Sequence, residues 1–374
     1  MNVLFIMNYA PAYSGNFMSS IWALEERINQ DKGKCVFVYP EAASRMDWVK
    51  KMQHDGELVF FKNGRLFHDY KLFKSLVGDY NIDIVYLHFW SLNDAIAIKS
   101  VQKKYKSLKF GIHHHNEYHV SDSRFREAVK HKILDADFHI GCSKYVTQEV
   151  RNAGYRNVHN VDNCVVFSRL DNWERLDLDS LSLKPRGGVL LLTFTSYSFQ
   201  AKGVDLSLKA IKKARDLGAE INLLIVTANE RELMLSQISA VCKEICGGIP
   251  EWVHTMNARD DVGTYYHAVD AYLNSSRTEG LCYSSIEAIY CGAQVIQSDI
   301  PQNRLDIPGT LIFESENVEQ LTAKLMEFSR DSRHATTLQR DYVLKHYSID
   351  SWVSGIMEIF DNEKKKSNEG TEKS

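Results

Sequence analysis

The sequence of 374 residues has no long hydrophobic run and no large excess of charge of either sign. Its first apolar run covers only residues 3–7, which is too short for a secretion signal or a membrane span. The net charge is −3, so the basic excess of a nucleic-acid-binding protein is missing, and we expect no nucleic-acid partner. With 44% hydrophobic and 25% charged residues, the composition indicates a folded globular protein.

Paired cysteine motifs are also missing. The seven cysteines are odd in number and none form the C-x-x-C spacing of a metal site. We therefore expect free thiols in a reducing compartment and a cytoplasmic protein. A complete G-x-G-x-x-G is absent as well, which gives no support to a nicotinamide-type dinucleotide fingerprint.

Short apolar runs alternate with amphipathic segments along nearly the whole chain, which is typical of doubly wound parallel α/β sheets. A charged segment ending in Pro and two glycines, residues 163–188, interrupts this alternation and predicts a domain boundary. We predict two Rossmann-like α/β domains facing each other across a cleft, at residues 1–165 and 185–345. The polar end of the chain, residues 362–374, is predicted to be disordered. The predicted strands are 3–7, 35–38, 84–88, 109–112, 138–142, 158–161, 189–195, 221–226, 252–255, 271–274 and 294–296.

Two loops follow predicted strands at the edge of a sheet where α/β proteins bind ligands. In "NYAPAYSGN", Gly15 lets backbone amides approach an anion, although Gly15 alone is slightly better explained by a turn. In "TSYSFQAKGVD", Lys202 precedes a predicted helix, where an ammonium group adds to the helix dipole against a phosphate. A solvated lysine beside a flexible glycine is the simpler alternative.

The stretch "EGLCYSSIE" holds two carboxylates eight positions apart. If a helix covers residues 285–291, Ser284 and Glu287 form a capping box that needs no ligand. That explanation does not account for Glu279 and Gly280, which precede the helix at the exit of a predicted strand. Helix-entry amides for an anion and flanking acids for hydroxyl groups suit a phosphorylated sugar.

The segment "NSSRTEGLCYSSIEAIYCGAQVIQSD" resembles the donor-binding segment of family 4 retaining glycosyltransferases, which have the GT-B fold. Three further stretches resemble the same family over most of the chain. They are "LLLTFTSYSFQAKGVDLSLKAI", "HTMNARDDVGTYYHAVDAYLNSS" and "GCSKYVTQEVRNAGYRNVHNVDN". The resemblance implies a donor-binding second domain, an acceptor-binding first domain, and a last helix, residues 346–361, that packs back on the first domain.

The resemblance also implies roles for single residues. Glu287 would bind the nucleotide ribose, Glu279 the sugar hydroxyls and Lys202 the diphosphate, while Gly15 would let the first loop approach the donor. The catalytic set would be Glu279, Lys202 and a histidine of "HHHN", for which His115 matches best and His113 and His114 stay open. The full donor-binding set would be Gly15, Lys202, Arg277, Glu279, Gly280, Leu281, Cys282, Tyr283, Ser284 and Glu287.

Metal ions and other cofactors are not expected. The three adjacent histidines raise a metal reading, but side chains on one strand alternate between faces and would not converge easily. The acidic pairs "DAD" and "DLD" lie in a turn and in the linker, so neither follows a core strand as metal-binding acids would.

Two departures from the family pattern stand out. The phosphate-binding Arg that usually precedes the Lys-Gly is missing near Ser196, and Arg277 is a hypothetical substitute. The second Gly of the motif is replaced by Cys282. The missing Arg keeps a silent nucleotide-sugar-binding subunit open as an alternative. A sugar-nucleotide epimerase of the same fold is a second alternative, which would need an acid/base set that the sequence does not reveal.

The expected activity is retaining transfer of a sugar from a UDP- or GDP-sugar to a saccharide or lipid-linked saccharide, in surface polysaccharide or glycoconjugate assembly. Residues 99–132 hold nine Lys or Arg against three acids. These basic residues favour an anionic membrane surface as a partner about as well as they favour ordinary solvated helix faces. The oligomeric state is left open.

Overall fold

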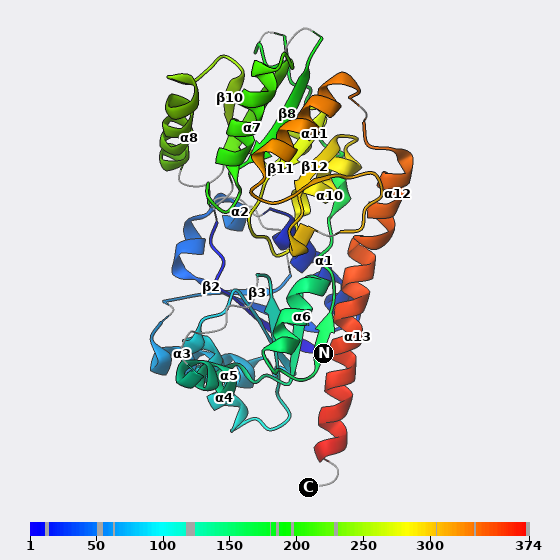
Figure 1. The fold of residues 1–374 in the computed structure, drawn as a ribbon. Coiled ribbons are helices and arrows are strands. Elements are labelled where there is room, and N and C mark those ends of the chain that lie inside the picture. Colours follow the sequence, from blue (N-terminus) through cyan, green and yellow to red (C-terminus); the bar gives the residue numbers. More distant parts are fainter. Residues whose placement is uncertain are drawn as a thin grey trace. The chain divides into compact units, whose positions relative to one another are not determined.

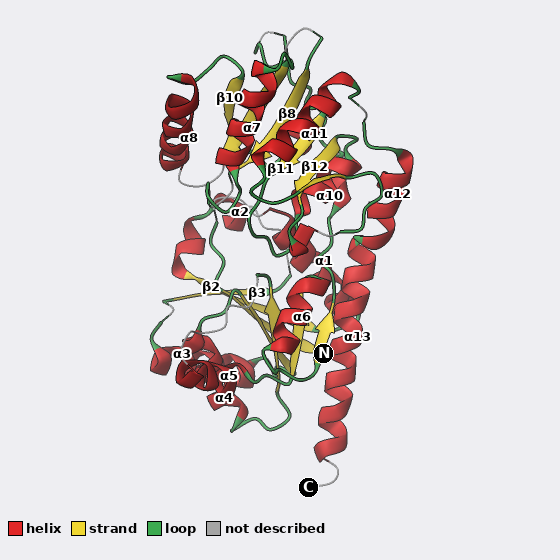
Figure 2. Ribbon diagram, in the orientation of Figure 1, coloured by secondary structure: helices red, strands yellow, loops and turns green. Residues whose placement is uncertain are grey.

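The computed structural model describes residues 1–11, 15–50, 55–62, 64–116, 124–179, 181–184, 187–195, 198–227, 231–303, 305–332 and 334–371. The chain divides into two compact units, shown in Figure 1. Unit 1 combines Met1–Cys164 with Ile349–Ser374, and unit 2 is Val165–Ser348. Each unit contains one parallel sheet with helices on its faces (Figure 2).

Unit 1 is built on a seven-stranded parallel sheet of order β3-β2-β1-β4-β5-β6-β7. Its strands are β1 (Asn2–Met7), β2 (Lys34–Pro40), β3 (Glu57–Phe61), β4 (Ile84–His88), β5 (Lys109–His114), β6 (Phe138–Gly141) and β7 (Val158–Asn160). Its helices are α1 (Gly15–Gln30), α2 (Asp47–Lys50), α3 (Leu66–Asp79), α4 (Leu92–Gln102), α5 (Arg124–Leu134), α6 (Lys144–Asn152), α13 (Ile349–Thr371) and a short 3-10 helix, η1 (Glu41–Arg45).

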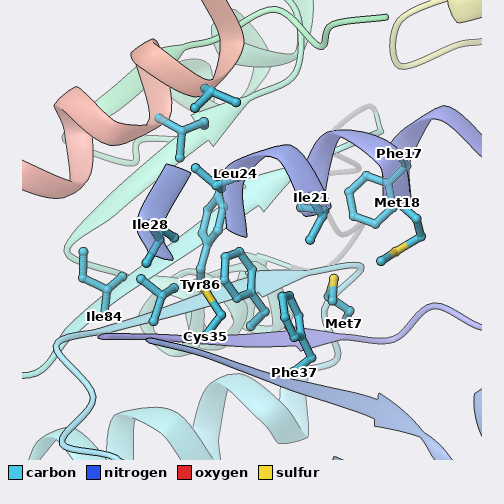
Figure 3. Packing of buried hydrophobic residues seen from close by; sticks show 14 of the residues in the cluster. Met7, Phe17, Met18, Ile21, Leu24, Ile28, Cys35, Phe37, Ile84 and Tyr86 are labelled. Atoms are coloured by element: carbon cyan, nitrogen blue, oxygen red, sulfur yellow. The ribbon is translucent and has the colours of Figure 1, made fainter. Parts of the chain in front are cut away.

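Both faces of the unit 1 sheet are apolar, because a parallel sheet covered by helices on both sides is buried on both sides. Alternate residues of β1 enter two different cores: Phe5 packs with α1 and α13, and Leu4 packs with α3, α4 and α6. Figure 3 shows the first of these cores, where Ile21 and Leu24 of α1 lie over the strands. This double burial explains the uninterrupted apolar runs of the sequence.

Unit 2 has a six-stranded parallel sheet of order β10-β9-β8-β11-β12-β13. Its strands are β8 (Val189–Phe194), β9 (Ile221–Thr227), β10 (Val253–Asn257), β11 (Ala271–Asn274), β12 (Gln294–Ser298) and β13 (Leu311–Phe313). Its helices are α7 (Val204–Asp216), α8 (Arg231–Cys246), α9 (Gly263–Tyr266), α10 (Tyr283–Tyr290), α11 (Val318–Arg330) and α12 (Thr337–His346), with 3-10 helices η2 (Phe167–Leu170) and η3 (Pro301–Asn303). Helices α7, α8 and α11 pack on one face of the sheet, and α9, α10 and α12 pack on the other.

The end of the chain differs from the prediction of disorder. Helix α13 continues to Thr371, so that prediction is wrong for residues 362–371. The extra turns are held by side chains far away in the sequence, since Asn157 donates to Glu363 (3.0 Å) and Lys364 pairs with Asp83 (2.9 Å). None of the helices in these described ranges is long and apolar enough to cross a membrane. All seven cysteines are free, as expected.

Candidate active site

In unit 2 the order of the strands reverses between β8 and β11, so the chain leaves these two neighbours in opposite directions. Such a switch point at the carboxyl ends of the strands is where open α/β sheets bind ligands. Lys202 follows β8 and Glu279 follows β11, and the structure brings them together: Lys202 Nζ lies 2.6 Å from Glu279 Oε1. Only 13% and 8% of the two side chains are exposed.

Glu279 is held by a second contact, because Ser276 Oγ donates to the same Oε1 at 2.6 Å. A carboxylate and an ammonium are therefore fixed beside each other, largely withdrawn from water. An ammonium and a carboxylate side by side suit a ligand that carries both anionic and hydroxyl groups.

Gly203 explains why a glycine follows this lysine. It is the N-cap of α7 with φ of 60° and ψ of 29°, a left-handed conformation that glycine adopts without strain. A Cβ built on it would lie 1.9 Å from the carbonyl oxygen of Ser275. The glycine thus allows α7 to begin directly against the end of β11, which sets Lys202 beside Glu279.

The predicted capping box is wrong. Helix α10 begins at Tyr283, two residues earlier than predicted, and its N-cap is Cys282, whose side chain makes no capping hydrogen bond. The Cys282 thiol instead accepts from Asn274 Nδ2 at 3.1 Å and from Ser285 Oγ at 3.3 Å. Burial raises the pKa of this thiol to about 11, so it stays protonated. Of the motif residues at this helix start, Leu281 and Cys282 are buried, while Gly280, Tyr283 and Ser284 are partly exposed.

Glu287 does not cap the helix. Its side chain is buried, and each of its carboxylate oxygens accepts a hydrogen bond. Arg169 NH1 donates to Oε1 at 3.2 Å, and the Tyr266 hydroxyl donates to Oε2 at 2.8 Å. Sequence reasoning missed both partners. Arg169 lies in residues 163–188, which the sequence predicts to be a domain boundary. No local sequence pattern can predict its contact with a glutamate 118 positions away.

Arg277 was the hypothetical replacement for the missing phosphate-binding arginine. Its guanidinium forms a two-pronged pair with Asp205, at 2.8 and 2.9 Å, and also pairs with Glu316. Two carboxylates thus occupy this side chain at the start of α7, and the phosphate role of Arg277 stays a prediction. Ser196, where the family arginine would stand, lies outside the described residues.

Unit 1 has a matching switch point, between β1 and β4. Gly15 is the first residue of α1, again with positive φ (60°), and Phe17 in the same first turn lies edge-on to the ring of His115, with centroids 5.0 Å apart. Asn8, after β1, donates to Asp94 at the start of α4 (2.6 Å) and so ties together the loops that follow the two strands. The first turn of α1, which Gly15 begins, therefore lies against His115.

The three histidines of "HHHN" do not share one environment. His113 and His115 lie on the face of the sheet that also carries His88, the last residue of β4. Ligand atoms of His88, His113 and His115 all lie within 4.8 Å of one another. The adjacent three do not converge on one point, as the alternation of side chains predicts, but the neighbouring strand β4 supplies a third ring to His113 and His115. His114 points to the other face, where its Nε2 lies 3.1 Å from His139 Nδ1. Of the adjacent three, only His115 is partly exposed.

Comparisons with known proteins agree with this architecture. Residues 189–331 match the sequence family described as Glycosyl transferases group 1. No curated protein matches the chain in sequence. A glycosyltransferase from Rickettsia africae ESF-5 superposes with a TM-score of 0.78 at 15% identity, over 97% of this chain and 98% of that one.

Two further solved structures are similar. HepE (Alr3699) from Anabaena, in complex with UDP, has a TM-score of 0.77 at 12% identity, over 97% of this chain and all of that one (100%). The apo form of the lipopolysaccharide outer core galactosyltransferase WaaB has a TM-score of 0.67 at 16% identity, over 97% of this chain and 99% of that one. The chain therefore has the GT-B fold, and the protein is a glycosyltransferase. Its unit 2 carries the group 1 domain, as the resemblance to family 4 implied.

Proposed function

We propose that the protein is a retaining glycosyltransferase that moves a sugar from a UDP- or GDP-sugar to a saccharide or lipid-linked saccharide in surface polysaccharide or glycoconjugate assembly. The observation that carries the proposal is the buried Lys202–Glu279 pair at the switch point of unit 2, next to the start of α10. A nucleotide sugar presents the two kinds of group that this pair complements: a diphosphate for the ammonium and sugar hydroxyls for the carboxylate.

Each residue then has a defined part. Lys202 and the backbone amides at the start of α10 neutralise the diphosphate, Glu279 accepts hydrogen bonds from the sugar, and Glu287 does so from the ribose. Gly15 and His115 contact the donor from unit 1. Stabilising the leaving diphosphate lowers the barrier to breaking the bond between it and the sugar carbon. The oxygen of the diphosphate that leaves the sugar carbon then takes the proton of the acceptor hydroxyl. The acceptor oxygen bonds to the same face of the sugar carbon that the diphosphate has left.

This scheme needs neither a protein nucleophile nor a metal ion, and we propose a metal-independent reaction. HepE is also known in complex with UDP-glucose, in a structure 13% identical to this chain with a TM-score of 0.76, which supports the choice of a nucleotide-sugar donor. The galactosyltransferase WaaB supports a saccharide acceptor of the surface-polysaccharide kind.

The test is incubation of the full chain with a panel of UDP- and GDP-sugars, with and without candidate acceptors, followed by detection of free nucleotide and sugar products. Nucleotide release that depends on acceptor, with the anomeric configuration kept in the product, supports the proposal. An epimerised donor without transfer would identify an epimerase. Donor binding without turnover would identify a silent binding subunit, the alternative that the missing arginine keeps open. Turnover is also measured in the presence of EDTA. Unchanged turnover supports a metal-independent reaction, and loss of turnover contradicts it.

We also propose that the acceptor side works in the cytoplasm at an anionic membrane surface, through the basic residues of α4, α5 and the segment between them. Lys99 pairs with Asp135, Lys109 with Asp137 and Lys130 with Glu127. The proposal is therefore tested on Lys103 and Lys104.

Sedimentation with vesicles of phosphatidylcholine, with and without phosphatidylglycerol, tests the membrane proposal. Binding should require the anionic lipid, and the Lys103→Glu/Lys104→Glu variant should weaken it. The adjacent lysines of unit 2, in the variant Lys212→Glu/Lys213→Glu, serve as the control. Binding that ignores anionic lipid, or that both variants weaken equally, would contradict the proposal.

A further inference from the structure

The histidine cluster of unit 1 holds the ring of His115 in one orientation. His88 Nδ1 lies 2.9 Å from His115 Nε2, a hydrogen bond between two imidazoles. The rings of Phe89 and His113 stack on His115, with centroids 4.4 and 4.2 Å away, and Phe17 meets it edge-on. The ring nitrogen that faces His88 is therefore Nε2, and Nδ1 is the nitrogen left to meet a ligand.

The arrangement of the rings argues against a metal ion in the cluster. The rings of His113 and His115 are nearly parallel, at 7°, and stacked. The lone pair of an imidazole nitrogen lies in the plane of its ring, and a zinc ion must lie about 2.0–2.1 Å along that lone pair. Stacked parallel planes do not meet, so these two rings cannot both direct a lone pair at one ion.

The hydrogen-bond inventory indicates which histidine donates. Burial lowers the pKa of His88 well below its usual range and that of His115 to about 3, so both rings are neutral and each carries one proton. His88 is fully buried, and among the described residues its Nε2 has no partner. A buried N–H without a partner is rarer in proteins than a buried acceptor without one. The proton of His88 is therefore on Nδ1, where it can be donated to His115 Nε2.

We infer that His88 is a positioning residue, which donates from Nδ1 to His115 Nε2 and thereby fixes His115 as the tautomer that carries its proton on Nδ1. His115 then offers a ligand a hydrogen-bond donor. The atom it suits is an oxygen of the donor sugar, and this part of the inference rests on the proposed function, in which His115 contacts that sugar. His88 itself is fully buried among Phe5, Phe17 and Tyr86, so it acts through His115.

The experiment is 15N NMR of the full chain labelled at the histidine rings, which distinguishes a protonated from an unprotonated ring nitrogen. The His115 signals are assigned by their loss in His115→Gln. We expect a protonated Nδ1 in the wild type, and a shift toward protonated Nε2 in His88→Phe, which fills the space without donating. His88→Asn places an amide N–H near the former Nδ1 and should restore the wild-type signals. His139→Phe, which removes the matched histidine pair on the other face of the sheet, is the control.

Kinetics with the donor identified above give a second measurement. Loss of a hydrogen bond that orients a reacting group should lower kcat in His88→Phe about tenfold, which His88→Asn should partly recover. The affinity for free UDP or GDP should not change. The NMR result does not depend on turnover, so it still decides the tautomer if no nucleotide sugar is used and the proposed function fails.

Three results would overturn the inference. The first is a wild-type His115 protonated on Nε2, and the second is a tautomer that does not change in His88→Phe. The third is one equivalent of zinc that stays with the dialysed protein and is lost in His113→Phe, since this would make the cluster a metal site.

Discussion

Replacing Glu279 by alanine should separate protein stability from donor binding. The wild-type carboxylate pairs with Lys202 at 2.6 Å, with 13% and 8% of the two side chains exposed. Removing one partner of a buried pair costs about 3–5 kcal/mol, because the remaining charge stays away from water without compensation. For a domain of about 150–250 residues, a loss of about 3 kcal/mol lowers Tm by about 6–12 °C.

Nucleotide affinity should move in the other direction. In Glu279→Ala the Lys202 ammonium no longer pairs with this carboxylate, so UDP or GDP should bind at least as tightly as in the wild type while sugar transfer is lost. Lys202→Met should instead weaken the nucleotide about tenfold or more, since a hydrogen bond to a charged group contributes about 1.5–3 kcal/mol.

Differential scanning calorimetry and isothermal titration with the free nucleotide measure the two effects. Lys184→Met is the control, because Lys184 pairs with Asp270 at 2.7 Å, and Asp270 also accepts from the backbone N–H of Leu190 at the amino end of β8, away from the switch point. It should lower stability without changing nucleotide affinity. If Glu279→Ala weakens nucleotide binding as much as Lys202→Met, the division of roles between the two residues is refuted.

Three further predictions concern stability. Gly203→Ala should cost more than the roughly 1–2 kcal/mol of a left-handed residue, because its Cβ would lie 1.9 Å from the Ser275 oxygen. Gly218→Ala, with φ of 92° and open space around it, is the control, and equal urea midpoints would show that the close approach to β11 is unimportant. Trp352→Ala, in the buried face of α13, should cost about 3–5 kcal/mol, and an unchanged midpoint would mean that α13 is not docked. Unit 1 should be labile to acid, because burial lowers the pKa of several of its histidines below the usual 6.5. The unfolded chain then binds protons that the folded chain does not, so stability present above about pH 6.5 is lost as the pH falls. Glu25, with a pKa raised by burial to about 7, and Asp69, whose pKa burial also raises, act in the opposite direction but are fewer than these histidines. Circular dichroism between pH 7 and 4 would test this, and constant stability over that range would contradict it. The histidines are His88, His113, His114, His115, His139 and His159.

Most of the sheets could be predicted from the sequence because their strands are continuous apolar runs buried on both faces. The two strands that were missed lack this signal. In strand β3, at the edge of the unit 1 sheet, only Phe61 is buried, and β13 has only three residues, of which Ile312 is exposed. Edge strands are covered less completely, so their sequences are less apolar.

The errors at helix ends have a different origin. The sequence "SSIE" satisfies the pattern of a capping box, yet α10 starts at Tyr283 because Ser285 donates to the Cys282 thiol and Glu287 is claimed by Arg169 and Tyr266. The polar residues after Asn362 look disordered for the same reason: their partners, such as Asp83, are separated from them by most of the chain. Local patterns cannot contain contacts of that range.

The histidines show how the register of a sheet creates a site that one strand cannot. Period-two alternation correctly separates His114 from His113, but it treats the strand as if it were alone. In the sheet, His88 of β4 is the direct partner of His113 of β5, and both lie at the carboxyl ends of strands. Side chains that meet on one face at the carboxyl end of the sheet therefore come from neighbouring strands. In the same way, Lys202 and Glu279 come from the loops that follow the neighbouring strands β8 and β11. The chemistry of both units is therefore set by which strands are neighbours at the switch point, and the first evidence for a site in such a chain is a pair of polar residues that end two adjacent strands.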